Sequence, residues 1–376
     1  MQQITVGWLV FRLTHSVFFL GIIGFADKIP VFLFSPFAGV LVDRYNNHKI
    51  LIWTQIFALI QALIFAFLIL SGQIQMWHIV VLVLSLGLIN SVDIPARQSF
   101  VVHMLEDRQD LGNAIALNSS IFNGARLIGP SIGGIMVALV GEGMCFLVNA
   151  GSFFFVILAL LNMKIPARLV KARITHPINE LKEGIMFAFG NPKIRHILMI
   201  VTLFNFLAFP YTILLPAFVG DILHGGPRTL GFLMASAGLG AFSGALYLAS
   251  RKTTAGLIKW ITAASLISSV SLILLSFTSK IETAFIFMAV CGLGMIVQMA
   301  SGNTILQTLV DDDKRGRVMS LFTIAAVGIG PFGSLLLGTM AQEIGIPLTL
   351  RVGGLVCLVG ALAFATRPDI IRFDSK

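Results

Sequence analysis

Six long apolar runs restrict the folds available to this chain more than any other feature. Each run has at least 20 residues and contains no Asp, Glu, Lys, Arg or His. About 20 apolar residues in a helix cross the hydrocarbon core of a bilayer, so each run predicts one transmembrane helix. The runs cover residues 50–71, 144–163, 197–218, 229–250, 283–306 and 318–341.

Five weaker apolar segments, most of them interrupted by one or two polar residues, bring the expected number of full spans to eleven. Composition supports this count, because only 11% of the residues are charged whereas soluble domains carry about 25%. We therefore expect an all-α polytopic membrane protein, and the same composition excludes soluble enzymes, nucleic-acid binders and secreted disulfide scaffolds. The weaker segments cover residues 17–42, 76–98, 111–140, 254–277 and 346–366.

The beginning of the chain allows two interpretations. Residues Ile4–Leu13 give an apolar helix of about 15 Å, half the thickness of the hydrocarbon core. A single span over Ile4–Phe25 would leave only the 14 residues of Ile29–Val42 for the next helix, which is too short to cross. We favour a half-length helix that ends near Arg12, followed by a full span over Val17–Val42. This interpretation implies that the first half of a twelfth helix is absent from the chain.

The longest polar segment, residues 164–196, separates two groups of spans. We expect an N-terminal helix bundle over residues 1–163 and a C-terminal bundle over residues 197–376, joined by a linker in which Pro177–Gly190 forms an amphipathic helix. Most of the 26 Lys and Arg residues fall in this linker and in loops on the same side. Basic loops stay cytoplasmic, so we expect a multi-pass protein of the inner (plasma) membrane, and the net charge of +9 needs no nucleic-acid partner.

The two groups of spans resemble each other. A shift of 204 residues places five glycines of the first group on five glycines of the second, where chance predicts about one pair in windows this rich in glycine. Repeated membrane bundles are the usual architecture of secondary transporters, with the solute site near the midplane between the repeats. The pairs are Gly112 and Gly316, Gly124 and Gly328, Gly129 and Gly333, Gly134 and Gly338, and Gly141 and Gly345.

One motif, Gly39-Val-Leu-Val-Asp43-Arg44, closes an apolar helix and opens a short loop. A carboxylate there can pair with basic groups in one conformation and release them in another. The motif resembles the signature loop of the major facilitator superfamily between its second and third helices, which implies a gating role. An ordinary charged turn at a helix end is the alternative.

A second motif places Gly129-Pro130 and Gly133-Gly134 in one span. Small residues let helices approach closely, and proline removes one backbone hydrogen bond, so the segment is a candidate hinge. It resembles the Gly-Pro-Gly signature that the superfamily's proton-driven exporters carry at this place. Packing without gating is the alternative.

Further resemblance points to a branch of the superfamily. Asp93-Ile-Pro95-Ala-Arg97-Gln98 resembles the Asp-x-Pro-x-Arg-Gln string of the enterobactin-exporter-like branch, and the first 14 residues look like the second half of its first helix. The resemblance implies the major facilitator fold of two pseudo-symmetric six-helix bundles. It also implies export of a hydrophobic or amphipathic small molecule, of the drug or siderophore class, by alternating access against proton entry.

Ionisable residues at membrane depth are the strongest candidates for coupling, because a charge there is costly unless it faces protein, water or a ligand. Asp27, Lys28 and Arg126 lie near the middle of predicted helices. We expect them, with Asp93 and Arg97, to bias the transporter between its states through contacts and protonation. Since sequence neighbours on a helix point in different directions, we expect Asp27 and Lys28 not to neutralise each other. For Asp27, Lys28 and Arg126 the alternative is structural pairing or an error in the span boundary.

Candidate solute contacts come from the resemblance, because the superfamily lines its pathway with its first, fourth, seventh and tenth helices. Aromatic and amide groups in an apolar cavity suit bulky amphipathic solutes, whereas helix packing is the alternative for each residue. The candidates are Gln3, Trp8, Asn90, Asn205, Tyr211 and Gln298.

The remaining expectations concern what the sequence lacks. It has no phosphate-binding loop for ATP and no histidine pair at metal-ligand spacing inside a span. We therefore expect no cofactor, no metal site and no enzyme activity, but a monomer that moves a small-molecule solute and protons. Two rivals stay open: a membrane-embedded enzyme, and a truncated remnant or fragment that does not transport.

Overall fold

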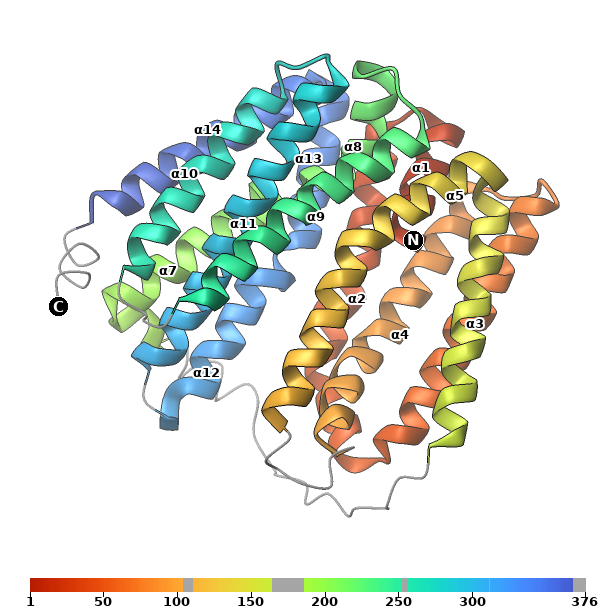
Figure 1. Ribbon diagram of the computed structural model, residues 1–376, viewed down its shortest axis with the longest axis horizontal. Helices are drawn as coiled ribbons and strands as arrows, with labels where there is room; N and C mark the ends of the chain where they lie inside the picture. The colour runs from red at the N-terminus through yellow and green to blue at the C-terminus, as the bar shows by residue number, and fades with distance from the viewer. Residues whose placement is uncertain (104–110, 164–185, 252–255, 311, 368–376) are drawn as a thin grey trace.

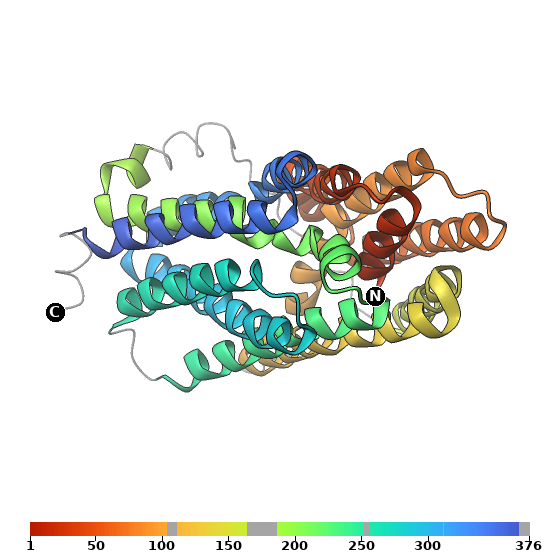
Figure 2. The same ribbon diagram turned by 90° about the horizontal axis from the view of Figure 1, so that it is seen from above.

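The computed structural model describes residues 1–103, 111–163, 186–251, 256–310 and 312–367. Within these ranges the secondary structure is helical, without a strand. Figure 1 shows two bundles side by side, with the earlier helices in one and the later helices in the other, and Figure 2 shows the same division from above. The first bundle contains α1 (Gln2–Thr14), α2 (Val17–Arg44), α3 (Asn47–Leu70), α4 (Met76–His103) and α5 (Leu111–Asn162).

The second bundle contains two spans that depart from a regular α-helix. The predicted helix 197–218 is a chain of short segments, because Pro210 and Pro216 each lack a backbone donor. The predicted helix 318–341 is interrupted before Gly330 and Pro331. In order, the segments are α7 (Pro192–Leu203), the π-helix η2 (Phe204–Ala208), the 3-10 helix η3 (Phe209–Ile213), α8 (Leu215–Ala217), the π-helix η4 (Phe218–Ile222), α9 (Pro227–Ser250), α10 (Leu257–Leu275), α11 (Ile281–Leu309), α12 (Asp312–Thr323), the π-helix η5 (Ile324–Gly328), α13 (Gly330–Ile344) and α14 (Ile346–Ala365).

The chain begins with a short helix and a sharp turn. After α1, His15 adopts a left-handed conformation with φ 46° and donates its backbone N–H to the carbonyl of Phe11. The second helix then starts at Val17. The predicted division into a short helix and a full span from Val17 is confirmed, and the single span over Ile4–Phe25 is wrong because this turn interrupts it.

The long helix α5 contains two of the predicted spans. Gly141 has φ 79° and ψ 171°, which a residue with a side chain rarely adopts. The chain folds back there, so that the arm before Gly141 lies beside α9 and the arm after it lies beside α3. Ten helices of the described residues are long and apolar enough to cross a membrane. Counting both arms of α5 gives the predicted eleven.

The turn at Gly141 has a counterpart in the second bundle. Gly345, between α13 and α14, has φ 84° and ψ 156°. These two glycines form one of the five pairs related by the shift of 204 residues. The sequence repeat is therefore also a repeat of backbone conformation.

A chain of buried and half-buried amides joins four helices of the first bundle. Asn149 donates to Gln2, Gln2 donates to Gln61, and Gln61 donates to the Leu82 carbonyl, each over 3.0 Å. Polar groups at membrane depth must be satisfied inside the protein, so these bonds fix the short α1 against α3, α4 and α5.

The expected amphipathic helix over Pro177–Gly190 lies mostly outside the described residues. Residues 186–190 are helical and lead into α7.

Candidate functional site

Two helix crossings join the bundles through glycine. At the first, α2 crosses α13, and a Cβ atom added to Gly21 would lie 2.8 Å from the Cα of Gly338. At the second, α5 crosses α9, and a Cβ added to Gly134 would lie 2.7 Å from the Cα of Gly231. Real Cβ atoms do not approach so closely, so both crossings depend on the missing side chains.

The repeat relates these crossings to each other. Gly134 and Gly338 are a predicted pair, whereas their partners Gly231 and Gly21 were not singled out from the sequence. Gly231 and Gly21 occupy the same place, in the second turn of α9 and α2. A sequence signal for them does exist. The starts of the two helices can be aligned at a shift of 210 residues, and this shift places Gly21 on Gly231.

The predicted hinge residues divide into two groups. Gly134 and Pro130 lie at the crossing with α9, since the Pro130 carbonyl oxygen would be 2.8 Å from a Cβ on Gly231. Gly133 packs against Met1, whereas a Cβ added to Gly129 would meet nothing within 4 Å. The segment therefore does pack between the bundles, but whether it bends stays a prediction.

Both crossings lie toward the same end of the molecule. This is the end of the Gly141 and Gly345 turns, and there the Ser16 hydroxyl of α2 donates to Oε1 of Gln342 on α13 over 3.0 Å. The backbone N–H of Phe18 donates to the same oxygen over 3.4 Å. Toward the other end, where α5 ends and α7 begins, the ribbons of the two bundles diverge (Figure 1).

Asp27 and Lys28 form an ion pair midway along α2. The Lys28 Nζ lies 2.8 Å from Asp27 Oδ2, and the two side chains are 49% and 24% exposed. The expectation that they do not neutralise each other is wrong, because the long lysine side chain reaches back to the neighbouring carboxylate. Both residues lie about 15 Å along α2 from its start, and their depth in the membrane stays a prediction.

Two faces of α2 define where this pair lies, one toward α4 and one toward α13. The Asp27 carbonyl and Pro30 pack against Gly87 of α4. Phe25 and Phe32 each meet the ring of Phe332 on α13 edge-on, with centroids 5.9 Å apart. Positions 21, 25, 28 and 32 share one helix face, so Lys28 lies on the face toward the second bundle.

Asp93 lies in a hydrogen-bonded cluster between α3 and α4. Its Oδ1 accepts bonds from Thr54 over 2.7 Å and from Gln55 over 2.8 Å. Its Oδ2 accepts two bonds from Arg97, the shorter over 2.8 Å. The Asp93 side chain is buried, whereas that of Arg97 is 55% exposed. The two predicted residues are thus brought together, and the sequence analysis did not single out Thr54 and Gln55.

The six candidate solute contacts are not brought together in one exposed site. Gln3 is exposed, and Trp8 and Asn90 are half-buried. Asn205, Tyr211 and Gln298 are buried. Asn205 donates to the Val201 carbonyl, and Gln298 donates to the Ile200 carbonyl. These bonds are helix-packing contacts in this conformation, and a contact with solute stays a prediction for all six.

The signature loop is only partly described. Gly39, Asp43 and Arg44 lie in the last two turns of α2, but their side chains fall outside the described part, as does the Arg126 side chain on α5. His48, just after the loop, donates from Nε2 to the Leu160 carbonyl over 2.7 Å and stacks on Phe100. This contact ties the start of α3 to the end of α5.

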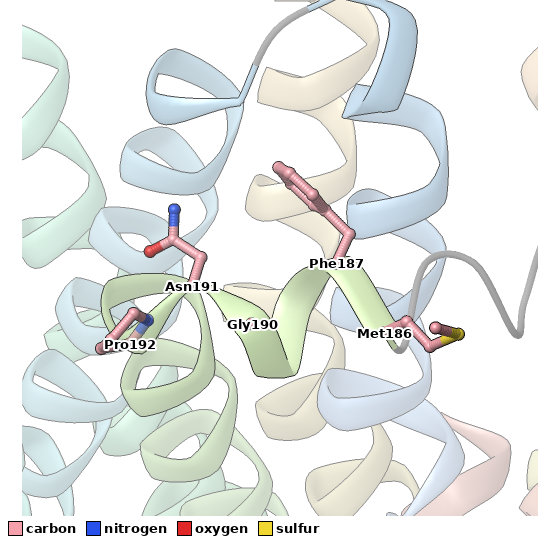
Figure 3. Close-up of a pocket in the computed structure, with 5 residues that line it drawn as sticks. All are labelled: Met186, Phe187, Gly190, Asn191 and Pro192. Carbon is pink, nitrogen blue, oxygen red and sulfur yellow. The ribbon is translucent and has the colours of Figure 1, made fainter.

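A pocket of about 520 Å³ opens at the linker end of the second bundle, far along the chain from every candidate. Figure 3 shows its lining, with Met186 directed away from Phe187 and Asn191. The Lys314 ammonium lies 4.6 Å from the centre of the Phe187 ring. No predicted site residue lines the pocket, so we assign it no part in solute binding. The other lining residues are Gly190 and Pro192.

Comparison with known proteins agrees with this arrangement. A profile described as "Transmembrane secretion effector" matches residues 1–375. The chain belongs to this family of the major facilitator superfamily. The staphyloferrin A transporter of Staphylococcus aureus is 25% identical over 100% of this chain and 94% of its own length. The multidrug efflux pump Tap of Mycolicibacterium fortuitum is 24% identical over 98% and 91%.

The fold is shared with a solved transporter. A crystal structure of a variant of the nucleoside transporter NupG superposes with a TM-score of 0.76 at 14% identity, covering 96% of this chain and 94% of that one. At this identity the likeness concerns the fold alone. The family member described here is thus a multi-pass membrane protein of the superfamily's efflux transporters, built on the major facilitator fold that the sequence predicts.

Proposed function

We propose that this transporter exports a hydrophobic or amphipathic small molecule of the drug or siderophore class by alternating access, with proton entry as the driving force. The relatives named above transport a siderophore and drugs, and that supports the solute class. The single observation that carries alternating access is the pair of glycine crossings. At these crossings the backbones of the two bundles are in contact at one end of the molecule. An alternating-access transporter needs a conformation that is closed at one end in this way.

The closed end is the outer one in this proposal. At the other end α5 ends and α7 begins. The segment between these helices and the other loops of the same side hold most of the basic residues in the sequence, and basic loops favour the cytoplasm. The conformation is then inward-facing, in a monomer in the inner (plasma) membrane, with residues 164–196 as the cytoplasmic linker between bundles 1–163 and 197–376. Solute leaves when the crossings at Gly21 and Gly134 separate.

Either Asp27 or Asp93 is the proposed proton carrier, and their surroundings predict different effects of a proton. Asp27 has Lys28 as its ion-pair partner, so a proton there releases an ammonium at membrane depth. Asp93 accepts bonds from Thr54 and Gln55 of α3, and a neutral acceptor makes weaker bonds than a carboxylate. A proton on Asp93 therefore loosens α4 from α3.

The proposal is tested in proteoliposomes with an imposed pH gradient. We expect gradient-driven movement of an amphipathic dye such as ethidium or of a ferric siderophore, and we expect the Asp27→Asn/Asp93→Asn double variant to lose it. Glu343→Gln, which neutralises an exposed carboxylate on α13, serves as the control and keeps transport. Undiminished gradient-driven movement in the double variant rules out both carriers, and no movement of any solute by the unaltered protein rules out export.

A further inference from the structure

We propose that Lys28 is the recognition site for an anionic group, a carboxylate in the first instance, on the apolar or aromatic body of the exported solute. This inference takes the direction of solute movement from the proposed function. The site itself is inferred from the geometry of α2 and α13.

Lys28 faces the second bundle at a level where that bundle leaves space. The contacts of Gly21 with Gly338, Gly24 with Ser334, and Phe32 with Gly328 set the register of the antiparallel pair α2 and α13. This register places Gly330 opposite Lys28, and a Cβ added to Gly330 would meet nothing within 4 Å. A half-exposed ammonium therefore lies at the level of a glycine around whose Cβ position there is open space.

The backbone opposite Lys28 is also irregular. The π-helix η5 ends at Gly328, and α13 begins at Gly330. Irregular backbone at membrane depth is tolerated where it is enclosed by protein or borders a water-filled cavity, and π-helical turns are frequent at functional sites. The level of Lys28 thus has the backbone features of a binding region.

The scaffold itself does not require the charges. The shift of 210 residues that relates Gly21 to Gly231 places Asp27 on Ala237 and Lys28 on Gly238. The equivalent helix α9 therefore makes its crossing with neutral residues at these positions. A charge present in only one repeat is better explained by an asymmetric solute than by packing.

The neighbours of Lys28 define the solute's chemistry. Phe25 and Phe32 on α2 and Phe332 on α13 form an aromatic group above and below it. An ammonium takes a carboxylate or a similar anion as its partner, and the rings accept an apolar body. In this structure the Asp27 carboxylate pairs with the Lys28 ammonium at 2.8 Å, so a solute anion has to displace this carboxylate to bind.

Displacement has a consequence for coupling. Because an anion on Lys28 and a proton on Asp27 favour one another, solute and proton bound at this pair would move in the same direction. Export against proton entry therefore requires the driving proton to bind elsewhere, and Asp93 is the other proposed carrier.

The test compares two probes with the same apolar body, naphthalene-2-carboxylate and its uncharged amide, by equilibrium dialysis against the purified full-length protein. We expect the carboxylate to bind about tenfold tighter than the amide, the size of one charge-assisted contact. Lys28→Met should remove this difference without changing amide binding. Lys28→Arg should keep the difference, and Asp27→Asn should increase it because the competing carboxylate is gone.

Two further variants keep the test decisive. Asp27→Asn/Lys28→Met leaves no unpaired charge in the membrane and should still lack the preference, even if the single lysine variant folds poorly. Lys280→Met removes a positive charge from an exposed loop position and should leave the preference unchanged. Equal binding of the two probes to the unaltered protein, or a preference that survives loss of Lys28, overturns the inference. Neither outcome depends on transport, so failure of gradient-driven export is recognised separately.

Discussion

At the scale of single residues, the two carboxylates proposed as proton carriers differ mainly in how many partners they have. Asp93 is buried and accepts bonds from three side chains, whereas Asp27 is partly exposed and pairs with its neighbour. Sequence position alone predicts the depth of both but not these partners. A carboxylate with many donors contributes to the stability of its bundle as well as to function.

Asp93→Asn is therefore expected to lower the free energy of unfolding by about 1–3 kcal/mol, the cost of leaving partners of a charged acceptor unsatisfied. The measurement is thermal or denaturant unfolding of the purified protein in detergent, followed by tryptophan fluorescence. Arg97→Gln should cost less, because the arginine side chain is 55% exposed and Thr54 and Gln55 still bond Asp93. Equal losses in the two variants would show that the ion pair, and not the whole cluster, stabilises the bundle.

At the scale of helices, the sequence predicts the number of spans better than their regularity. Hydropathy finds all eleven spans because length and polarity suffice for a bilayer. It does not reveal that α7 continues into π and 3-10 segments or that η5 interrupts the span predicted over residues 318–341. Those irregularities depend on packing between helices, which periodicity within one helix does not encode. Gly141 and Gly345 were found as a pair because their backbone angles exclude other residues.

Gly141→Ala and Gly345→Ala should each destabilise the protein by about 1–3 kcal/mol, because both glycines have positive φ and a side chain strains such a turn. Unfolding in detergent measures the loss. Gly129→Ala is the matched control, since a Cβ there meets nothing within 4 Å, and it should be neutral or stabilising by up to about 1 kcal/mol. A large difference between the two turn variants would contradict their equivalence.

At the scale of the whole molecule, the two bundles meet at crossings that the repeat makes equivalent. The candidate site is less predictable than the fold, because it lies between elements distant in sequence. Lys28 and Gly330 face each other only through the register of α2 and α13, and Gln342 meets Ser16 across the same seam. The sequence predicts Asp27 and Lys28 from their position within an apolar span. Nothing in the sequence around Phe332 or Gln342 indicates a role, because their contacts appear only in the folded structure.

A disulfide between Ser16→Cys and Gln342→Cys, in a background without the three native cysteines, should stop transport by holding the crossings closed. The Ser16 hydroxyl and the Gln342 Oε1 are in contact at 3.0 Å. Formation of the disulfide is measured first, by loss of free thiols under an oxidant, and its reduction should restore transport. The control replaces Arg12 and Glu142, which contact each other within the first bundle at 2.8 Å, by cysteines. Transport that continues with the first bond formed would contradict opening at this end.

The closure at Gly21 and Gly134 consists of backbone against backbone, and Gly21 lies about two helical turns along α2 from Lys28. The device that opens the protein and the surface that chooses its cargo are consequently separable. Substitutions that change the size or charge of the region around Lys28 can therefore accumulate without disturbing the glycine crossings. One scaffold can in this way evolve to carry chemically different solutes.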